Sequence, residues 1–143
     1  MQSIERTVRV DRPLEAVWTY LSDFRSTNDW DPGTVETVRS SGDGGVGTVY
    51  HNTSKFLGRE VEVDYTVVEL ESQRLLRLHG ENKSVSLTDT ITFDGDARSA
   101  TVTYTARFEL KGAARLADPL MRFPLKKLGD EAEQGLRDNL NRL

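Results

Sequence analysis

The 143-residue chain has no cysteine and only two histidines. Without cysteine it can form neither a disulfide framework nor a thiolate nucleophile, and a structural zinc site has few ligands to draw on. No apolar run approaches the ~20 residues that a membrane-spanning helix needs. The opening MQSIERTVRV carries charges where a signal peptide has its apolar core. We therefore expect no metal, no integral membrane segment and a reducing, cytoplasmic location.

The chain also has fewer basic than acidic residues. The chain has 23 acidic and 19 basic residues, a net charge of −4, which disfavours binding to a phosphate backbone. Hydrophobic residues at 36% and charged residues at 29% are ordinary for a globular protein. The length suits one domain, and no linker or internal repeat divides it. We expect a single domain over residues 1–143, a monomer or weak homodimer that does not bind nucleic acid.

The spacing of the apolar residues changes near residue 11 from the period of a strand to that of a helix, and this change predicts the first two elements. The alternation in SIERTVRV indicates a strand. A helix should follow, with Asp11 as its N-cap and Pro13 in its first turn. Its apolar face is predicted to carry Leu14, Val17, Trp18 and Leu21. The segment SDF then predicts a second short helix that runs to about Trp30 and ends at the turn DPG, residues 31–33.

From residue 34 to residue 110 the dominant period is two. Strands are predicted in TVETVRS, GTVYHNTSKF, REVEVDYTVVEL and RLLRLHG, and as a hairpin in SVSLTDTITFDGDARSATVTYTARFEL. Their short connections imply a seven-stranded antiparallel sheet, counting the first strand, with one apolar face. The facing of the strand over residues 74–80, and of His79 within it, stays open.

The C-terminal segment carries the apolar stripe that could cover this sheet. After Leu116 its apolar positions lie mostly four apart: Leu120, Leu128, Ala132, Leu136, Leu140 and Leu143. Pro119 and Pro124 interrupt it, and proline costs ~3 kcal/mol inside a helix. We predict a bent or late start between them and a continuous helix from about Leu125. The alternative is a loop through Pro124 and a shorter helix. Gly129 and Gly135 are interpreted as further weak points.

This order of elements resembles the START-like, helix-grip superfamily of polyketide cyclases and dehydratases, lipid-transfer domains and relatives of the major birch pollen allergen. The resemblance rests on VDRPLEAVWTYLSDFRSTNDWDP, GDGGVGTVY and LADPLMRFPLKKLGDEAEQGLRDNL, found in that order. It implies an α+β helix-grip fold: two short helices after strand 1, then a seven-stranded antiparallel sheet wrapped around a long C-terminal helix. An apolar cavity is then expected between sheet and helix, with the loosened helix start at its mouth.

The glycine-rich GDGGVGT is not interpreted as a phosphate loop. A nucleotide P-loop needs a lysine followed by serine or threonine at the start of a helix, whereas here Thr48 leads into a strand. We interpret it as a strand connection, which the resemblance places at the rim of the cavity. His51 follows Tyr50 in the same strand, so its side chain lies on the opposite face and is expected to face solvent. We also expect no bound cofactor.

Asp89 is the strongest candidate for chemistry. It is the central one of five alternating positions in SVSLTDTITF, and the other four are apolar: Val85, Leu87, Ile91 and Phe93. Alternation therefore directs its carboxylate into an apolar interior, where desolvation would raise its pKa and leave a proton to donate near neutral pH. Two alternatives stay open: a bulge that turns Asp89 outward, and a structural carboxylate held by a tyrosine or an arginine.

Aromatic and amide side chains are the other expected ligand contacts. Tyr65 and Tyr104 share faces with apolar neighbours, and the family's register turns Tyr50 and Asn52 inward; core packing is the alternative for the tyrosines. Trp30 is expected to close one end of the cavity or to pack beneath its rim. The full set of predicted ligand-binding residues is Trp30, Tyr50, Asn52, Tyr65, Asp89, Tyr104, Phe108, Leu120 and Phe123.

Three functions are compatible with these features. The first is binding, transport or sequestration of a hydrophobic small molecule, such as a lipid or polyketide, between sheet and helix. The second is a polyketide cyclase or dehydratase that uses Asp89 and a tyrosine for proton transfer. The third is a protein-interaction domain without a ligand. One fold hosts all three, so fold alone does not choose.

Overall fold

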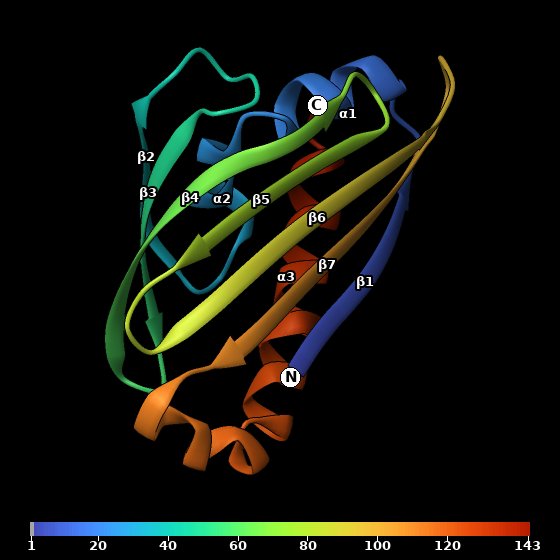
Figure 1. Cartoon of the computed structure of the whole chain (residues 1–143). Helices are drawn as coiled ribbons and strands as arrows, with labels where there is room; N and C mark the ends of the chain where they lie inside the picture. The colour runs from blue at the N-terminus through green and yellow to red at the C-terminus, as the bar shows by residue number, and fades with distance from the viewer. Residues whose placement is uncertain (1) are drawn as a thin grey trace.

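The chain forms one antiparallel sheet with helices on one side. The computed structural model describes residues 2–143, apart from the side chains of Asp118 and Arg122. Sheet order is β1-β7-β6-β5-β4-β3-β2 (Figure 1). The strands are β1 (Gln2–Val10), β2 (Thr34–Ser41), β3 (Val49–Phe56), β4 (Arg59–Glu71), β5 (Leu75–Glu81), β6 (Val85–Gly95) and β7 (Ala100–Leu110). The helices are α1 (Leu14–Leu21), α2 (Thr27–Trp30) and α3 (Arg122–Leu140), with 3₁₀ helices η1 (Phe24–Ser26) and η2 (Gly112–Leu120).

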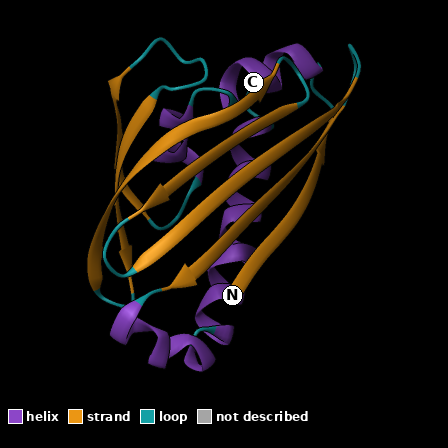
Figure 2. Cartoon of the chain, in the orientation of Figure 1, coloured by secondary structure: helices purple, strands orange, loops and turns teal. Residues whose placement is uncertain are grey.

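The predicted α+β helix-grip arrangement is confirmed. Figure 2 shows the strands wrapping around α3, while the short helices carry the chain from β1 at one sheet edge to β2 at the other. Strand alternation places the predicted apolar sets inside, because successive side chains point to opposite faces. The facing of β5 is now assigned: Leu76, Leu78 and Gly80 are buried, and His79 lies on the outer face, where it pairs with Thr88 across to β6.

The prediction of Asp11 as the N-cap of α1 is wrong. The helix begins at Leu14, with Pro13 at the N-cap position and no side-chain cap. The amide of Leu14 instead donates to the carbonyl of Asp96, at 2.8 Å, because the β6–β7 turn lies over the helix start. The second predicted helix is confirmed as η1 followed by α2, with Asp23 accepting from the amide of Arg25 at 3.0 Å.

The late start of the C-terminal helix is confirmed. Pro119 lies in the 3₁₀ turns of η2, and α3 begins at Arg122, so that Pro124 falls in its first turn. A proline there removes no helical hydrogen bond, since the first amides of a helix have no intrahelical acceptor. The alternative of a loop through Pro124 is therefore wrong.

Gly129 and Gly135 are close-contact positions instead of weak points. A Cβ atom on Gly135 would lie 2.1 Å from the carbonyl oxygen of Trp30, and one on Gly129 would lie 2.7 Å from Cγ2 of Ile4. The glycines therefore let α3 approach α2 and β1 more closely than any larger residue would. The helix is held tightly from its middle to its C-terminal end.

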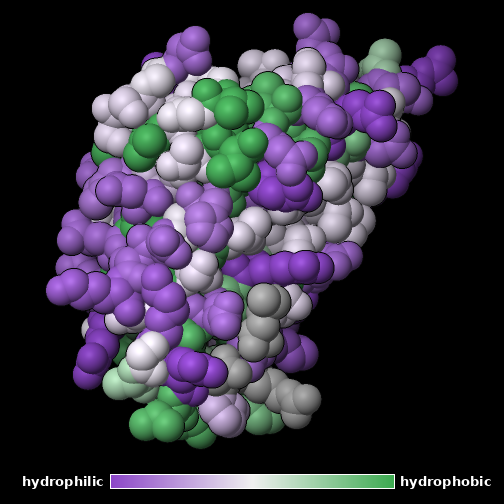
Figure 3. Space-filling model, in the orientation of Figure 1, coloured by the Kyte–Doolittle hydropathy of each residue, from purple (hydrophilic) through white to green (hydrophobic). Residues whose placement is uncertain are grey.

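The corner between η2 and α3 exposes apolar side chains. Leu116, Leu120 and Phe123 are 85%, 77% and 80% exposed. Figure 3 shows apolar surface at the end of the molecule where η2 runs in Figure 1. Within the described part of the chain, no helix has both the length and the apolar character to cross a membrane.

We predict that Gly135→Ala lowers stability, because the added methyl group would meet the Trp30 carbonyl. Overpacking of this kind costs ~1–3 kcal/mol, and each kcal/mol lowers Tm by about 2–4 °C at this chain length. Thermal unfolding followed by circular dichroism measures the change. The matched control is Gln134→Ala, the exposed neighbour on α3. Equal Tm values for the two variants would contradict the tight docking of α3.

Candidate functional site

A cavity of about 250 Å³ lies between the inner face of the sheet and α3. Most of its wall is apolar and includes Ile4, Val63, Leu87, Phe108, Met121 and Leu125. Exposed Lys55 and Ser84 also line it and mark its mouth. Beside the mouth, the amide of Lys111 at the end of β7 donates to the Ser84 carbonyl at 2.7 Å.

Polar side chains gather in one part of the cavity. Along β6 the wall runs from Val85 to Asp89, whereas the next inward residues of that strand, Ile91 and Phe93, belong to the solid core. The polar end, as we call it, consists of Asp31, Asn52, Tyr65, Asp89 and Tyr104.

Asp89 points into the protein, as the alternation on β6 predicts. It is only 5% exposed, and its one hydrogen bond within the described residues comes from the Tyr104 hydroxyl, at a long 3.4 Å to Oδ2. Burial raises its pKa from 3.8 to about 7; the charge of Asp31 adds to the rise and the Tyr104 bond opposes it. Because a charged carboxylate is costly in an apolar site, Asp89 exchanges a proton near neutral pH. The alternative of an outward-turning bulge is wrong.

The carboxylate of Asp31, unlike that of Asp89, accepts two hydrogen bonds of normal length. Its Oδ1 accepts from the Gly33 amide at 3.1 Å and its Oδ2 from the Thr34 hydroxyl at 2.9 Å. A chain of donors leads to it, since Ser54 donates to Asn52 at 2.5 Å and Asn52 donates to Thr34 at 3.2 Å. Burial raises the pKa of Asp31, and these two bonds oppose the rise in part. The ionised form is thus better supported by hydrogen bonds at Asp31 than at Asp89.

The two tyrosines of the polar end keep their protons. Burial is the main cause that raises the pKa of Tyr65 and of Tyr104, and the charge of Asp89 adds to both. Tyr65 packs against Phe24, with ring centroids 5.2 Å apart. Each tyrosine therefore presents a neutral hydroxyl at neutral pH.

The structure brings together five of the residues selected from sequence. These five residues line the cavity: Asn52, Tyr65, Asp89, Tyr104 and Phe108. Their position is thereby known, while a role in binding is a matter for experiment.

Two further selected residues lie behind the cavity wall. The Trp30 ring stands edge-on to Tyr104 at 5.2 Å, and its Nε1 donates to the Ser26 hydroxyl at 3.1 Å. Tyr50 lies behind Phe24, with ring centroids 5.8 Å apart. The buried Tyr50 hydroxyl finds no hydrogen bond of normal geometry among the described residues, although the Phe24 amide partly compensates it electrostatically.

Leu120 and Phe123 do not reach the cavity. Both lie on the exposed corner between η2 and α3, and the cavity wall there is made by Met121 and Leu125 instead. Since α3 begins at Arg122, the residues one turn apart at 121 and 125 face the sheet. Placing Leu120 and Phe123 in the wall was therefore wrong.

Sequence reasoning also missed wall residues. Phe24 and Asp31 line the cavity, but both were assigned only to the ends of short helices. The signal that could have found Asp31 is its position directly after Trp30, which is buried. Met121 and Leu125 could have been found from their spacing of four once the helix start was known.

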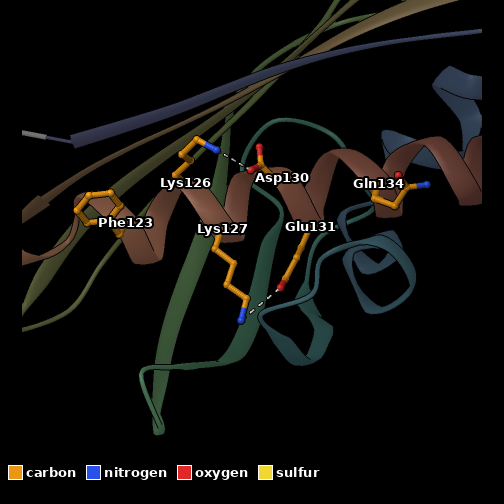
Figure 4. Close-up of a pocket in the computed structure, with 6 residues that line it drawn as sticks. All are labelled: Phe123, Lys126, Lys127, Asp130, Glu131 and Gln134. Carbon is orange, nitrogen blue, oxygen red and sulfur yellow. Dashed lines mark hydrogen bonds and ion pairs between the residues drawn. The ribbon is translucent and has the colours of Figure 1, made fainter.

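A second hollow, of about 420 Å³, lies on the outer face of α3 and is open to solvent. Figure 4 shows Phe123 at one end of it and two ion pairs along it, Lys126–Asp130 at 3.2 Å and Lys127–Glu131 at 3.9 Å. Its charged groups pair with one another along the helix, as exposed charges usually do. The enclosed cavity is therefore the better candidate site despite its smaller volume.

The histidines belong to the outer face of the sheet. His51 bonds Asp64 at 2.7 Å and Glu62 at 3.1 Å, and these bonds raise its pKa. Across the described residues, no three histidines, cysteines or acids are grouped so that they could hold a metal ion.

Comparison with known proteins gives one family match and many similar folds. Residues 1–141 match the family described as polyketide cyclase/dehydrase and lipid transport. A search of curated proteins finds no match.

Three solved structures show the shared fold. The Zhui aromatase/cyclase from Streptomyces sp. R1128 is 16% identical, with a TM-score of 0.82 over 99% of this chain and 94% of that one. A START superfamily protein from Mycobacterium smegmatis is 11% identical, with a TM-score of 0.80 over 98% and 97%. Norcoclaurine synthase from Thalictrum flavum is 20% identical, with a TM-score of 0.60 over 93% and 84%.

We predict that Asp89→Asn stabilises the protein at high pH and not at low pH. The folded-state pKa of Asp89, about 7, lies above its ordinary 3.8. Wild-type stability is therefore fully retained below about pH 4 and falls as the pH rises through 7. The neutral amide escapes this loss, so its advantage should reach a few kcal/mol by about pH 8.

Urea unfolding of both proteins at about pH 4.5 and about pH 8 measures this difference. Asp94→Asn, which removes an exposed charge from the same strand, is the control and should show no such dependence. A stability difference between Asp89→Asn and wild type that is the same at both pH values would rule out the raised pKa.

Proposed function

Because this chain belongs to the polyketide cyclase/dehydrase and lipid transport family, we propose that it binds a hydrophobic small molecule between the sheet and α3. The observation that supports this proposal is the cavity itself, whose wall is apolar except for one polar end. Burial of apolar ligand surface supplies ~25 cal/mol per Å². The few polar groups then set the orientation of the ligand.

The volume favours a compact ligand. At ~30 Å³ per water molecule, 250 Å³ corresponds to about eight waters, roughly the size of a two-ring compound. Ligand pockets usually measure ~300–1,000 Å³, so a long lipid chain would have to extend through the mouth. A ring compound fits the closed cavity better.

In this proposal five wall residues contact the ligand: Asn52, Tyr65, Asp89, Tyr104 and Phe108. Trp30 and Tyr50 support the wall from behind. The protein acts as a monomer or weak homodimer in the cytoplasm, in keeping with its lack of cysteine and its net negative charge. Light scattering coupled to gel filtration tests the oligomeric state.

A second candidate function is catalysis in the same cavity, as a cyclase or dehydratase. The observation that favours it is Asp89, a buried acid that exchanges its proton near neutral pH beside the Tyr104 hydroxyl. Such a pair could give a proton to a carbonyl oxygen of a bound polyketide or take one from its carbon chain. The similarity to an aromatase/cyclase fold is compatible with this role but does not distinguish it from binding.

We predict that filling the cavity abolishes binding. Ala106 on β7 pairs with Asp89 on β6 and lines the same wall, and Ala106→Phe places a ring in the ligand's space. Calorimetry with naphthylmethanol, a neutral two-ring probe, should show at least a roughly tenfold loss of affinity. Native mass spectrometry of protein purified from its source should likewise lose any copurifying ligand. The control is Phe123→Ser on the exposed corner, which should bind as wild type does. Unchanged binding by Ala106→Phe would remove the cavity as the site.

We predict that Asp89→Asn separates carrier from enzyme. A carrier loses one polar contact, so affinity changes by about 1–3 kcal/mol. An enzyme that uses Asp89 as acid or base keeps binding but loses ~10²–10⁴-fold in turnover. Product formation from a poly-β-ketone substrate, measured beside naphthylmethanol binding, tells the two apart. Wild-type turnover in the variant would exclude Asp89 as the proton donor.

A further inference from the structure

The amide and hydroxyl donors on the β3 side of the cavity are already in use. Asn52 gives its two N–H groups to the hydroxyls of Thr34, at 3.2 Å, and Thr37, at 2.8 Å. The Ser54 hydroxyl donates to the Asn52 oxygen at 2.5 Å. An amide has two donors and a hydroxyl has one, so these groups have no hydrogen left for a ligand.

The same holds for most hydroxyls next to the two carboxylates. Thr34 donates to Asp31 at 2.9 Å, and Tyr104 donates to Asp89 at 3.4 Å. Acceptors, by contrast, remain free. Oδ1 of Asp89 has no partner among the described residues, and neither does the hydroxyl of Tyr65, a cavity-lining side chain that is only 7% exposed. Unpaired polar groups at such depth are costly unless something satisfies them.

The charge around the polar end has one sign. Asp31 comes from the α2–β2 connection and Asp89 from β6, while the other titratable groups there are Tyr65 on β4 and Tyr104 on β7. The described residues that α3 and β1 contribute to the wall are not titratable. Among the lining residues whose side chains the structure describes, the one cation is Lys55, which is exposed at the mouth.

We propose that the polar end takes the ammonium group of a small organic amine whose body is an apolar ring system. This inference rests on the proposed function, because it names the class of ligand that the same cavity binds. An ammonium group brings three donors and no acceptor, which matches a site with free acceptors and few free donors. Its positive charge also compensates the two carboxylates of the polar end, of which Asp89 is buried and Asp31 partly buried.

Other head groups match the site less well. A carboxylate would add a third negative charge beside Asp31 and Asp89. An alcohol brings one donor and no charge, so it leaves the carboxylate charge of the polar end uncompensated. Binding an ammonium also favours the ionised form of Asp89. Since burial holds the pKa of Asp89 at about 7, amine binding below neutral pH must release its proton.

The test compares three probes of one shape: naphthylmethylamine, naphthylmethanol and naphthoate. Calorimetry should show the amine binding about tenfold or more tightly than the alcohol, because hydrogen bonds to charged groups are the stronger ones. Amine affinity should rise about tenfold between about pH 6 and about pH 8 as Asp89 ionises, with proton release visible in buffers of different ionisation enthalpy. The alcohol should show no such rise.

Two variants test whether the preference for the amine over the alcohol depends on Asp89. Asp89→Asn should lose both the amine preference and the proton release, so that its affinities for amine and alcohol become similar, whereas Asp94→Asn, on the outer face of the same strand, should behave as wild type. Alcohol or naphthoate binding as tightly as the amine would overturn the inference and leave the proposed function standing. Failure of all three probes to bind would overturn both. An amine preference that survives in Asp89→Asn would also overturn the assignment to this end of the cavity.

Discussion

The contact between α3 and the backbone of α2 at Gly135 is the constraint on which the rest of this molecule depends. A single Cβ atom would not fit between Gly135 and the Trp30 carbonyl, so the helix is held at its C-terminal half against the short helices. At its other end, Pro119 and Pro124 let the helix begin only at Arg122. A helix docked at one end and started late at the other covers the sheet incompletely. The cavity is the space that remains between the sheet and the first half of α3.

The polar end shows how one fold gives two carboxylates different chemistry. Asp31 receives two good hydrogen bonds from its own turn, whereas Asp89 has one long contact in an otherwise apolar layer. Environments that separate two acids in this way are typical of sites that handle protons or cations. This difference arises from the backbone, because a turn offers amides and the middle of a strand has already used its own in the sheet.

How much of the fold and of the cavity wall could be predicted from the sequence differed between strands and helices, because their side chains repeat with different periods. Strand alternation has a period of two, so the facing of Asp89 followed from its neighbours alone. The wall at the start of α3 did not follow, because Leu120 belongs to the 3₁₀ turns of η2 and not to α3, so the spacing of the later leucines does not extend to it. Met121 and Leu125 form the wall there. Asp31 enters the cavity through a contact between distant segments, which no local pattern records. Family resemblance supplied the layers but not these details.

The exposed corner at η2 bears on the exchange kinetics of any ligand that the cavity binds. A 3₁₀ helix has poorer hydrogen-bond geometry than an α-helix, and Leu116 and Leu120 of η2 contribute little burial. Segments of this kind open locally at a lower free energy than the core. Because η2 joins β7 next to the cavity mouth, its local opening would affect how fast a ligand enters and leaves. Substitutions at this corner would then change the rates of exchange, whereas substitutions in the cavity wall would change the affinity.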